Sequence, residues 1–196
     1  MAGLDDTVLI ERCQKGDRTA FDELIRRHSE RAYKYAFRLT GNAEEASDVV
    51  GDAFVRVFNA MKNFKGQSAF TTWLYRIITN CFLDLRKKDR SKQTTSLDAM
   101  LQTPDGEMAR QIEDPNRNPY QEAERSSRED RVMHAVDQLA EYQKAMIMMF
   151  HVEMLSYEEI AEALDLPIGT VKSRLNRARL SLREILTRDE ELFRLG

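Results

Sequence analysis

Apolar residues recur at three- and four-residue steps along most of the chain, which is the spacing that places them on one face of an α-helix. No stretch shows the alternation of apolar and polar residues that is typical of a half-buried strand. Six segments before residue 155 follow the helical spacing, at residues 7–14, 18–39, 43–61, 69–88, 128–139 and 141–153. We therefore expect an all-α fold.

Residues that stabilise helix ends stand between the first three of these segments. Asp17 and Asn42 precede the second and third helices, where their side chains can accept hydrogen bonds from free N–H groups of the first turn. Glu45 follows Asn42 three residues later, and Gly16 and Gly41 stand where the preceding helices should end. The sequence thus predicts corners at residues 16–17 and 41–42.

The helical spacing fails between Asp89 and about Ser127, where polar residues dominate and three prolines occur. A segment of this length is too long for a simple connection within one compact domain, so it is either disordered or threaded along a partner. The sequence predicts two small helical domains joined by a long flexible linker. Their expected bounds are 1–90 for the N-terminal domain, 91–127 for the linker, 128–188 for the C-terminal domain and 189–196 for a frayed tail.

Residues 155–183 predict a helix-turn-helix, which would complete a four-helix C-terminal domain. Ser156 can cap the first helix of the pair, and Glu159 completes a capping box with it. Residues 165–167 end that helix, because the residue before a proline is pushed out of the α-helical region. The second helix of the pair begins near Ile168.

The second helix of this pair combines an apolar stripe with a basic and polar face. The stripe consists of Val171, Leu175, Ala178 and Leu182. The candidate DNA-reading residues on the remaining surface are Thr170, Lys172, Ser173, Arg174, Asn176 and Arg177. Such side chains neutralise phosphates and reach base edges in the major groove. An ordinary solvated helix usually mixes charges of both signs, whereas no acidic residue follows here until Glu184.

Composition and charge fit a protein that meets nucleic acid through particular helices. Hydrophobic residues make up 42% and charged residues 32%, and the formal net charge is −3. Five of the nine basic residues after position 130 nevertheless lie between Lys172 and Arg183. No apolar run approaches the roughly 20 residues needed to span a membrane, and no signal-peptide pattern opens the chain. We expect a cytoplasmic protein without membrane insertion.

Neither a catalytic arrangement nor a metal site is visible in the sequence. His28, His134 and His151 are scattered, and Cys13 and Cys81 lack the spacing of metal ligands. No Gly-rich phosphate loop follows a strand. We expect no enzymatic activity, no metal and no cofactor.

The third helix carries an acidic side with Asp48 and Asp52, which is either a solvated face or a surface for a partner. The loop at residues 63–68, with Phe64, Lys65 and Gln67, precedes a helix that ends in basic residues. Aromatic and cationic side chains in this setting can hold an unstacked base of a single strand, although they can also be core and helix-end residues alone.

These segments together resemble the bacterial extracytoplasmic-function (ECF) sigma factors, the small two-domain class of RNA polymerase initiation subunits. The resemblance covers most of the chain, in two sets of motifs separated by the nonperiodic linker. It is carried by residues 16–21, 42–48, 53–58, 70–77, 80–88, 157–161 and 167–179.

The resemblance implies site residues of three kinds. The implied readers of the −35 element are Thr170, Lys172, Ser173, Arg174, Asn176 and Arg177. The implied readers of the melted −10 element are Phe64, Lys65, Gln67, Arg76, Asn80, Asp84, Arg86 and Lys87. The implied polymerase-docking residues are Asp48, Asp52, Phe54 and Arg56. The family usually has Gln-Glu where this chain has Gly51-Asp52, a departure within the docking helix.

The resemblance also implies partners: core RNA polymerase through its β′ clamp helices and β flap, promoter DNA, and an anti-sigma factor. The linker would run through the polymerase cleft. A stand-alone helix-turn-helix regulator is the alternative, but it leaves the acidic helix and the aromatic loop unexplained. A response-regulator output domain would need an α/β phosphoacceptor domain, for which there is no strand pattern.

Overall fold

A computed structural model describes residues 5–95 and 130–194 of the protein, with side chains for residues 5–90 and 130–188. Every element of regular structure within these residues is helical, which confirms the predicted all-α fold. The linker prediction falls largely on residues 96–129, outside the described residues.

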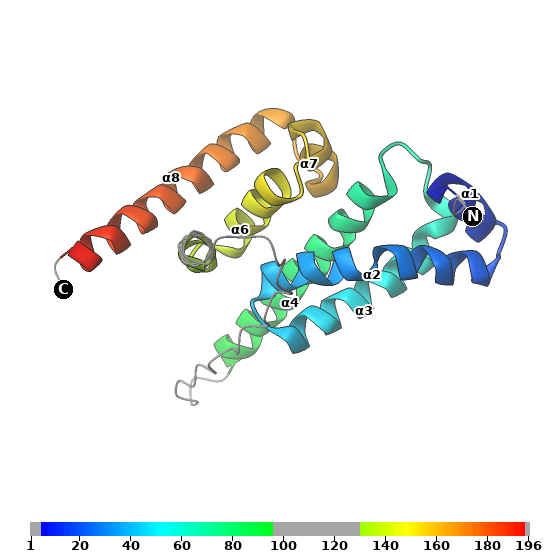
Figure 1. The fold of residues 1–196 in the computed structure, drawn as a ribbon, viewed down its shortest axis with the longest axis horizontal. Helices are drawn as coiled ribbons and strands as arrows, with labels where there is room; N and C mark the ends of the chain where they lie inside the picture. Colours follow the sequence, from blue (N-terminus) through cyan, green and yellow to red (C-terminus); the bar gives the residue numbers. More distant parts are fainter. Residues whose placement is uncertain (1–4, 96–129, 195–196) are drawn as a thin grey trace, which may run out of the picture.

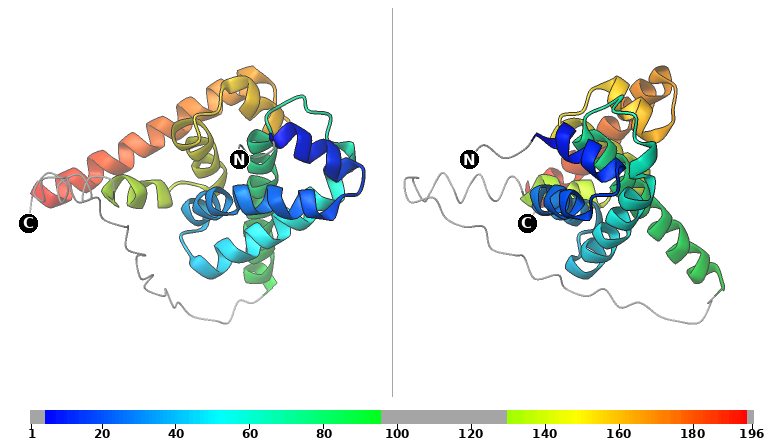
Figure 2. Two further views of the ribbon diagram at one scale, coloured as in Figure 1. Left: turned by 45° about the vertical axis from the view of Figure 1, so that its right-hand side comes forward. Right: turned by 90° about the vertical axis from the view of Figure 1, so that its right-hand side faces the viewer.

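Four helices form the N-terminal group: α1 (Asp6–Gln14), α2 (Arg18–Thr40), α3 (Ala43–Ala60) and α4 (Phe70–Thr95). A 3-10 turn, η1 (Met61–Asn63), leads into the loop before α4. The α4 helix crosses the α2–α3 pair, and α1 lies at one end of the group beside η1 (Figures 1 and 2).

The predicted helix caps are present in the structure and confirm the two predicted corners of this group. The Asp17 carboxylate accepts hydrogen bonds from the N–H groups of residues 19 and 20, and the Asn42 side chain accepts from those of residues 44 and 45. Gly41 adopts the left-handed conformation with φ of 72° at the end of α2. The Glu45 carboxylate does not return to the Asn42 backbone, because Arg86 of α4 holds it instead.

The core of the N-terminal group lies between α2, α3 and α4. Leu24, Ile78 and Phe82 are fully buried there, and burial of side chains of this size contributes about 1.5–3 kcal/mol each. The hydroxyls of Tyr35 and Thr79 share a buried hydrogen bond of 2.8 Å, and burial raises the pKa of Tyr35. This bond satisfies both buried hydroxyls and fixes the register of α2 on α4.

The C-terminal group contains a helix over residues 130–137, α6 (Glu141–Ile147), a π-helical turn η2 (Met148–Val152), α7 (Tyr157–Leu164) and α8 (Ile168–Arg194). Met146, Met148 and Met149 are fully buried, as expected of methionines that fill gaps in a core. The predicted single helix over residues 141–153 is therefore α6 followed by a π-helical turn, whose wider backbone spacing apolar periodicity does not reveal.

The two groups touch through α4, against which α6 and α7 pack. The Thr72 hydroxyl of α4 donates a hydrogen bond of 2.9 Å to the Glu159 carboxylate of α7. Arg38 of α2 lies 3.7 Å from the carboxylate of Glu153. Two glutamates of the C-terminal group therefore contact the N-terminal group: Glu159 contacts Thr72, and Glu153 contacts Arg38.

The α4 helix continues to Thr95, whereas the sequence predicted an end near Lys88. The prediction relied on apolar spacing, which stops at Leu85. Arginine, lysine and glutamine favour helices without an apolar stripe. An ion pair between Arg90 and Glu141 of α6 further supports this extension.

The α8 helix continues to Arg194, six residues beyond residue 188, where the sequence predicted the C-terminal domain to end. Leucine, glutamate and arginine dominate this stretch, and all three have high helix propensity.

Two glycines provide a test of these local conformations. Gly51 lies on the exposed face of α3 in helical geometry, and an added Cβ would meet nothing within 4 Å. Gly51→Ala should therefore stabilise the protein by about 0.5–1 kcal/mol in chemical denaturation, because alanine loses less backbone entropy on folding. Gly41→Ala is the matched control and should destabilise it by about 1–2 kcal/mol, since alanine is strained at a positive φ. Shifts of the same sign in both variants would contradict these assignments.

Candidate nucleic-acid interface

The predicted helix-turn-helix is present as α7 and α8. The Ser156 hydroxyl accepts a hydrogen bond of 3.1 Å from the Glu159 N–H, and the Glu159 carboxylate accepts one of 2.9 Å from the Ser156 N–H. These two bonds form the predicted capping box. The α7 helix ends at Leu164, and Asp165 after it adopts the left-handed conformation with φ of 52°. The turn therefore begins two residues before Pro167.

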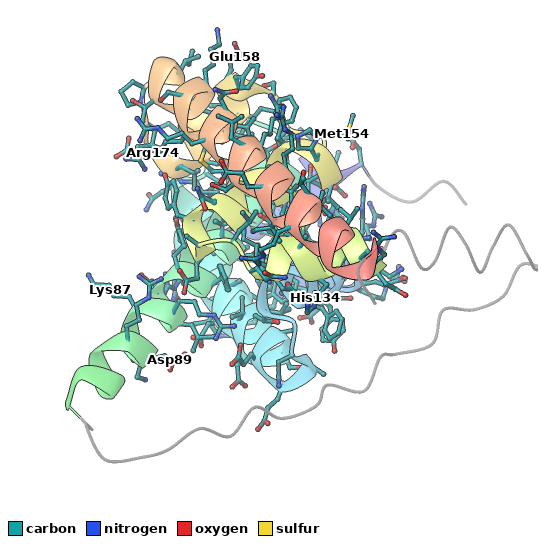
Figure 3. The ribbon with its side chains drawn as sticks, turned by 90° about the vertical axis from the view of Figure 1, so that its left-hand side faces the viewer. Lys87, Asp89, His134, Met154, Glu158 and Arg174 are labelled. Atoms are coloured by element: carbon teal, nitrogen blue, oxygen red, sulfur yellow. The ribbon has the colours of Figure 1, made fainter. Side chains whose placement is uncertain are left out.

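Three cations of α8 lie over aromatic rings of their own domain. The ring-centroid distances are 5.7 Å for Lys172 over Tyr157, 4.9 Å for Arg174 over Tyr142, and 4.7 Å for Arg179 over Phe150. Such cation–π contacts are attractive and hold flexible side chains in place. Figure 3 shows Arg174 projecting from the flank of α8. The sequence showed the charges of these residues but not their ring partners.

Ser173, Asn176 and Arg177 are exposed on α8 beside its buried stripe of Val171 and Leu175. The Ser173 hydroxyl donates to the Thr170 carbonyl within the helix. These side chains thus form the outward part of the predicted −35 reader, flanked by the cations that rest on rings.

His151, which sequence reasoning left without a role, belongs to this surface. It lies on the π-helical turn, and its Nε2 accepts a hydrogen bond of 3.0 Å from the Nε of Arg179. Burial and the charge of Arg179 both lower the pKa of His151. A neutral His151 therefore helps to orient Arg179, a contact 28 residues apart that no local pattern announces.

The loop between η1 and α4 carries an aromatic cluster and opens into a pocket. The Phe64 ring lies 4.6 Å from Trp73 and 6.4 Å from Phe70, measured between centroids. A pocket of about 480 Å³ lies beside this cluster. Its walls come from α1, the loop and the start of α4, and Lys65 lies in the loop wall. Gln67 is exposed nearby on the same loop.

Another residue that sequence reasoning missed is Gln14, at the end of α1. Its side-chain amide donates hydrogen bonds to the Phe64 carbonyl at 2.7 Å and to the Met61 carbonyl at 3.3 Å. The partners lie 47 and 50 residues away, so no spacing in the sequence could pair them.

The remaining candidates on α4 divide into two sets. Arg76 and Asn80 are half-buried and Lys87 is exposed, and they continue along α4 from the aromatic cluster. Figure 3 shows Lys87 projecting outward from α4. Asp84 forms a 2.8 Å ion pair with Arg56 of α3. Arg86 hydrogen-bonds the Glu45 carboxylate and the Thr40 carbonyl, so its guanidinium braces the corner between α2 and α3.

The outer face of α3 holds the predicted docking residues. Asp48 and Asp52 are exposed, whereas Phe54 is half-buried and packs against the core. Val55 and Phe58 are 60% and 50% exposed on the same helix, although the apolar pattern assigned no surface role to them. Acidic and apolar side chains are therefore available together on α3.

Comparisons with known proteins match both groups of helices. Residues 24–92 match the family described as sigma-70 region 2, and residues 129–182 match sigma-70 region 4. The ECF RNA polymerase sigma-E factor of Escherichia coli is 35% identical over 179 residues, which cover 90% of this chain and 91% of that protein. The chain belongs to the ECF sigma factor family.

Other relatives of this ECF sigma factor agree. The RNA polymerase sigma-H factor of Pseudomonas aeruginosa is 35% identical over 185 residues, or 92% of this chain and 93% of the relative. The ECF RNA polymerase sigma factor SigE of Mycolicibacterium smegmatis is 37% identical over 177 residues, which cover 88% of this chain and 65% of that longer protein.

Two solved structures share the fold of this ECF sigma factor. CnrH in complex with the cytosolic domain of CnrY has a TM-score of 0.63 at 24% identity, with 94% of this chain and 98% of that chain covered. The sigma factor RpoE in complex with the anti-sigma factor NepR from Bartonella quintana has a TM-score of 0.65 at 22% identity, with 85% and 96% covered.

The described part of this ECF sigma factor offers neither a membrane span nor a metal site. None of its helices within residues 5–95 and 130–194 is long and apolar enough to cross a bilayer. Within the same residues, no three His, Cys, Asp or Glu side chains are grouped so as to hold a metal ion.

The His151–Arg179 contact predicts a pH dependence. Because the pKa of His151 is lowered in the folded state, the unfolded chain binds a proton more readily. Stability should therefore fall as the pH drops below about 6.5, the ordinary histidine value. The urea midpoint of the wild type should decrease more between about pH 7.5 and 5.5 than that of His151→Gln, which accepts the same hydrogen bond without titrating. Equal decreases would show that His151 does not contribute.

Proposed function

We propose that this ECF sigma factor binds core RNA polymerase and directs it to promoters by reading two DNA elements with two separate surfaces. The main support for this proposal is that one chain contains both a helix-turn-helix with an outward basic face and an aromatic loop beside a basic helix. Both lie in the segments that match sigma-70 regions 2 and 4. A stand-alone regulator would use only the first of these surfaces.

In this proposal α8 enters the major groove of the −35 element. Ser173, Asn176 and Arg177 face outward and can reach base edges. Lys172 and Arg174 lie over rings of their own domain, and together with the half-buried Thr170 they carry groups that suit phosphates along the groove. The rings beneath Lys172 and Arg174 already restrict these side chains in the free protein. Less conformational entropy is therefore lost when they bind DNA.

The −10 element is read as a single strand by the loop and α4. Unstacking a base costs a few kcal/mol, which stacking on aromatic rings and hydrogen bonds offset. The cluster around Phe64 supplies the rings, and the loop and exposed side of α4 supply polar and basic groups at Lys65, Gln67, Arg76, Asn80 and Lys87. Asp84 and Arg86 are already paired within the protein, so we assign them to shaping this surface.

The polymerase contact is assigned to α3. Asp48 and Asp52 provide exposed charge for the β′ clamp helices, Arg56 lies on the same helix, and Phe54 supports the surface from below. The β flap would meet the C-terminal domain. The fold shared with the sigma factor RpoE, which was solved in complex with the anti-sigma factor NepR, supports an anti-sigma factor as a further partner.

We further propose residues 1–90 and 128–188 as the two functional domains and 91–127 as the connection between them. The family assignment and the absence of a recognised catalytic arrangement in the sequence support a protein without enzymatic activity of its own. It would act in the cytoplasm, where core polymerase and chromosomal DNA meet.

Transcription of fragmented genomic DNA with purified core RNA polymerase, with and without this protein, tests the proposal. New RNA 5′ ends that share upstream −35 and −10 elements are expected, and they would also give the promoter sequence. DNA binding without polymerase and without new starts would instead support a stand-alone regulator.

Substitution of two arginines of α8 distinguishes a residue that reads bases from one that also packs on its own domain. Arg177→Ala should weaken binding of a mapped −35 duplex and relax discrimination at the base that it reads, with little change in stability, because Arg177 is exposed. Arg174→Ala should also lower the free energy of unfolding by about 0.5–1 kcal/mol, because it loses the contact with Tyr142. Anisotropy titrations and urea denaturation measure the two effects. Identical results for both variants would contradict the division.

A further inference from the structure

Gln14 links α1 to the loop that carries the aromatic cluster. Its amide nitrogen donates to the backbone carbonyls of Met61 and Phe64, one on each side of the point where η1 ends. A single planar amide with two donors thus holds both the start of η1 and the start of the loop. The side chain is half-buried, so these bonds are partly protected from water.

The α1 helix is firmly attached to α2, so Gln14 is a fixed donor. Leu9 and Cys13 are buried against the core. At the start of α1, the Asp6 carboxylate lies 2.7 Å from the Nε2 of His28. At its end, Arg12 forms an ion pair of 2.7 Å with Asp17, which also caps α2. Contacts at both ends therefore hold α1 on α2.

The loop itself has little internal structure to define its position. Residues 64–69 lie outside any helix, and Gly66 adopts a positive φ of 66°. The Phe64 N–H donates to the Met61 carbonyl at 3.1 Å. The Phe64 carbonyl is held instead by Gln14, and the Phe64 ring packs on Trp73. The position of Phe64 therefore depends on α1.

The pocket beside the loop is lined by α1 and the loop, together with the start of α4. Thr7, Ile10 and Gln14 line it from α1, and Lys65 and Ser68 line it from the loop. Residues 6–14 precede the segment that matches sigma-70 region 2, which begins at residue 24. One wall of the pocket thus lies outside the matched domain.

We propose that Gln14 is a positioning residue for recognition of the −10 element: it holds the loop carbonyls so that the Phe64 ring and the pocket keep the shape that receives an unstacked base. The inference rests on the proposed function and adds α1 to the surface that reads the single strand. Gln14 acts through the loop and need not touch DNA.

Two substitutions of nearly the same size test the inference in the full-length protein. Gln14→Glu replaces the donating amide by a carboxylate that faces two carbonyl oxygens, and Gln14→Met removes the donors without adding charge. Gln143→Glu is the matched control. Gln143 donates one hydrogen bond of 3.2 Å to Ser181 in the C-terminal domain, far along the chain from the loop. It makes the same chemical change away from the recognition loop.

The probes are a single-stranded oligodeoxynucleotide with the −10 element mapped by transcription and a duplex with the mapped −35 element. Both Gln14 variants should bind the single strand about tenfold more weakly, because the part-buried Phe64 carbonyl loses its donor, and bind the −35 duplex as the wild type does. They should also discriminate less between the mapped −10 sequence and one with a changed base. Gln143→Glu should match the wild type on the single strand.

The single tryptophan of the chain gives a readout that does not depend on DNA. Trp73 packs against Phe64 with a centroid distance of 4.6 Å, so its emission should shift in both Gln14 variants and stay unchanged in Gln143→Glu. Wild-type single-strand binding in both Gln14 variants would overturn the inference. Equal losses on both probes would also overturn it, because they would indicate a general folding role. Failure of the wild type to start transcription or bind either probe would instead overturn the proposed function and, with it, this role.

Discussion

Burial of the apolar face of α4 against α2 and α3 fixes the geometry on which the other surfaces depend. Ile78 and Phe82 fill that face, and the Tyr35–Thr79 hydrogen bond sets its register. Once α4 is placed, a different side of the same helix meets the C-terminal domain at Thr72. The aromatic loop is attached to its beginning and the basic residues to its far part. One packed helix therefore relates the loop, the polar stripe and the second domain to each other.

Charge in this protein is divided between ion pairs that join neighbouring helices and cations on exposed surfaces, which explains why net charge says little about function. On α3 and α4, Arg56 forms an ion pair with Asp84, and Arg86 forms one with Glu45. Each pair joins two neighbouring helices. Lys87 and Arg177 remain exposed on surfaces that face outward. An acidic total charge and two basic binding surfaces are thus compatible, because attraction to phosphate depends on the local arrangement of cations.

Local rules predicted much of the fold because they act within a few residues. Asp17, Asn42 and Ser156 cap helices where the sequence places them, and the apolar stripes of α4 and α8 are buried as their spacing requires. For the binding surfaces, the sequence predicted which residue types lie there but not which side chains they contact. The contacts of Gln14 with the loop and of His151 with Arg179 join distant segments, and only tertiary packing brings them together.

The Glu159 carboxylate serves two neighbours through different oxygens. Its Oε2 accepts from the Ser156 N–H and completes the cap of α7, while its Oε1 accepts from Thr72 across the domain boundary. Loss of the second bond leaves the first intact. The helix-turn-helix can therefore leave α4 as a rigid body without unwinding, and the free energy needed to separate the domains does not include refolding of the DNA-reading unit.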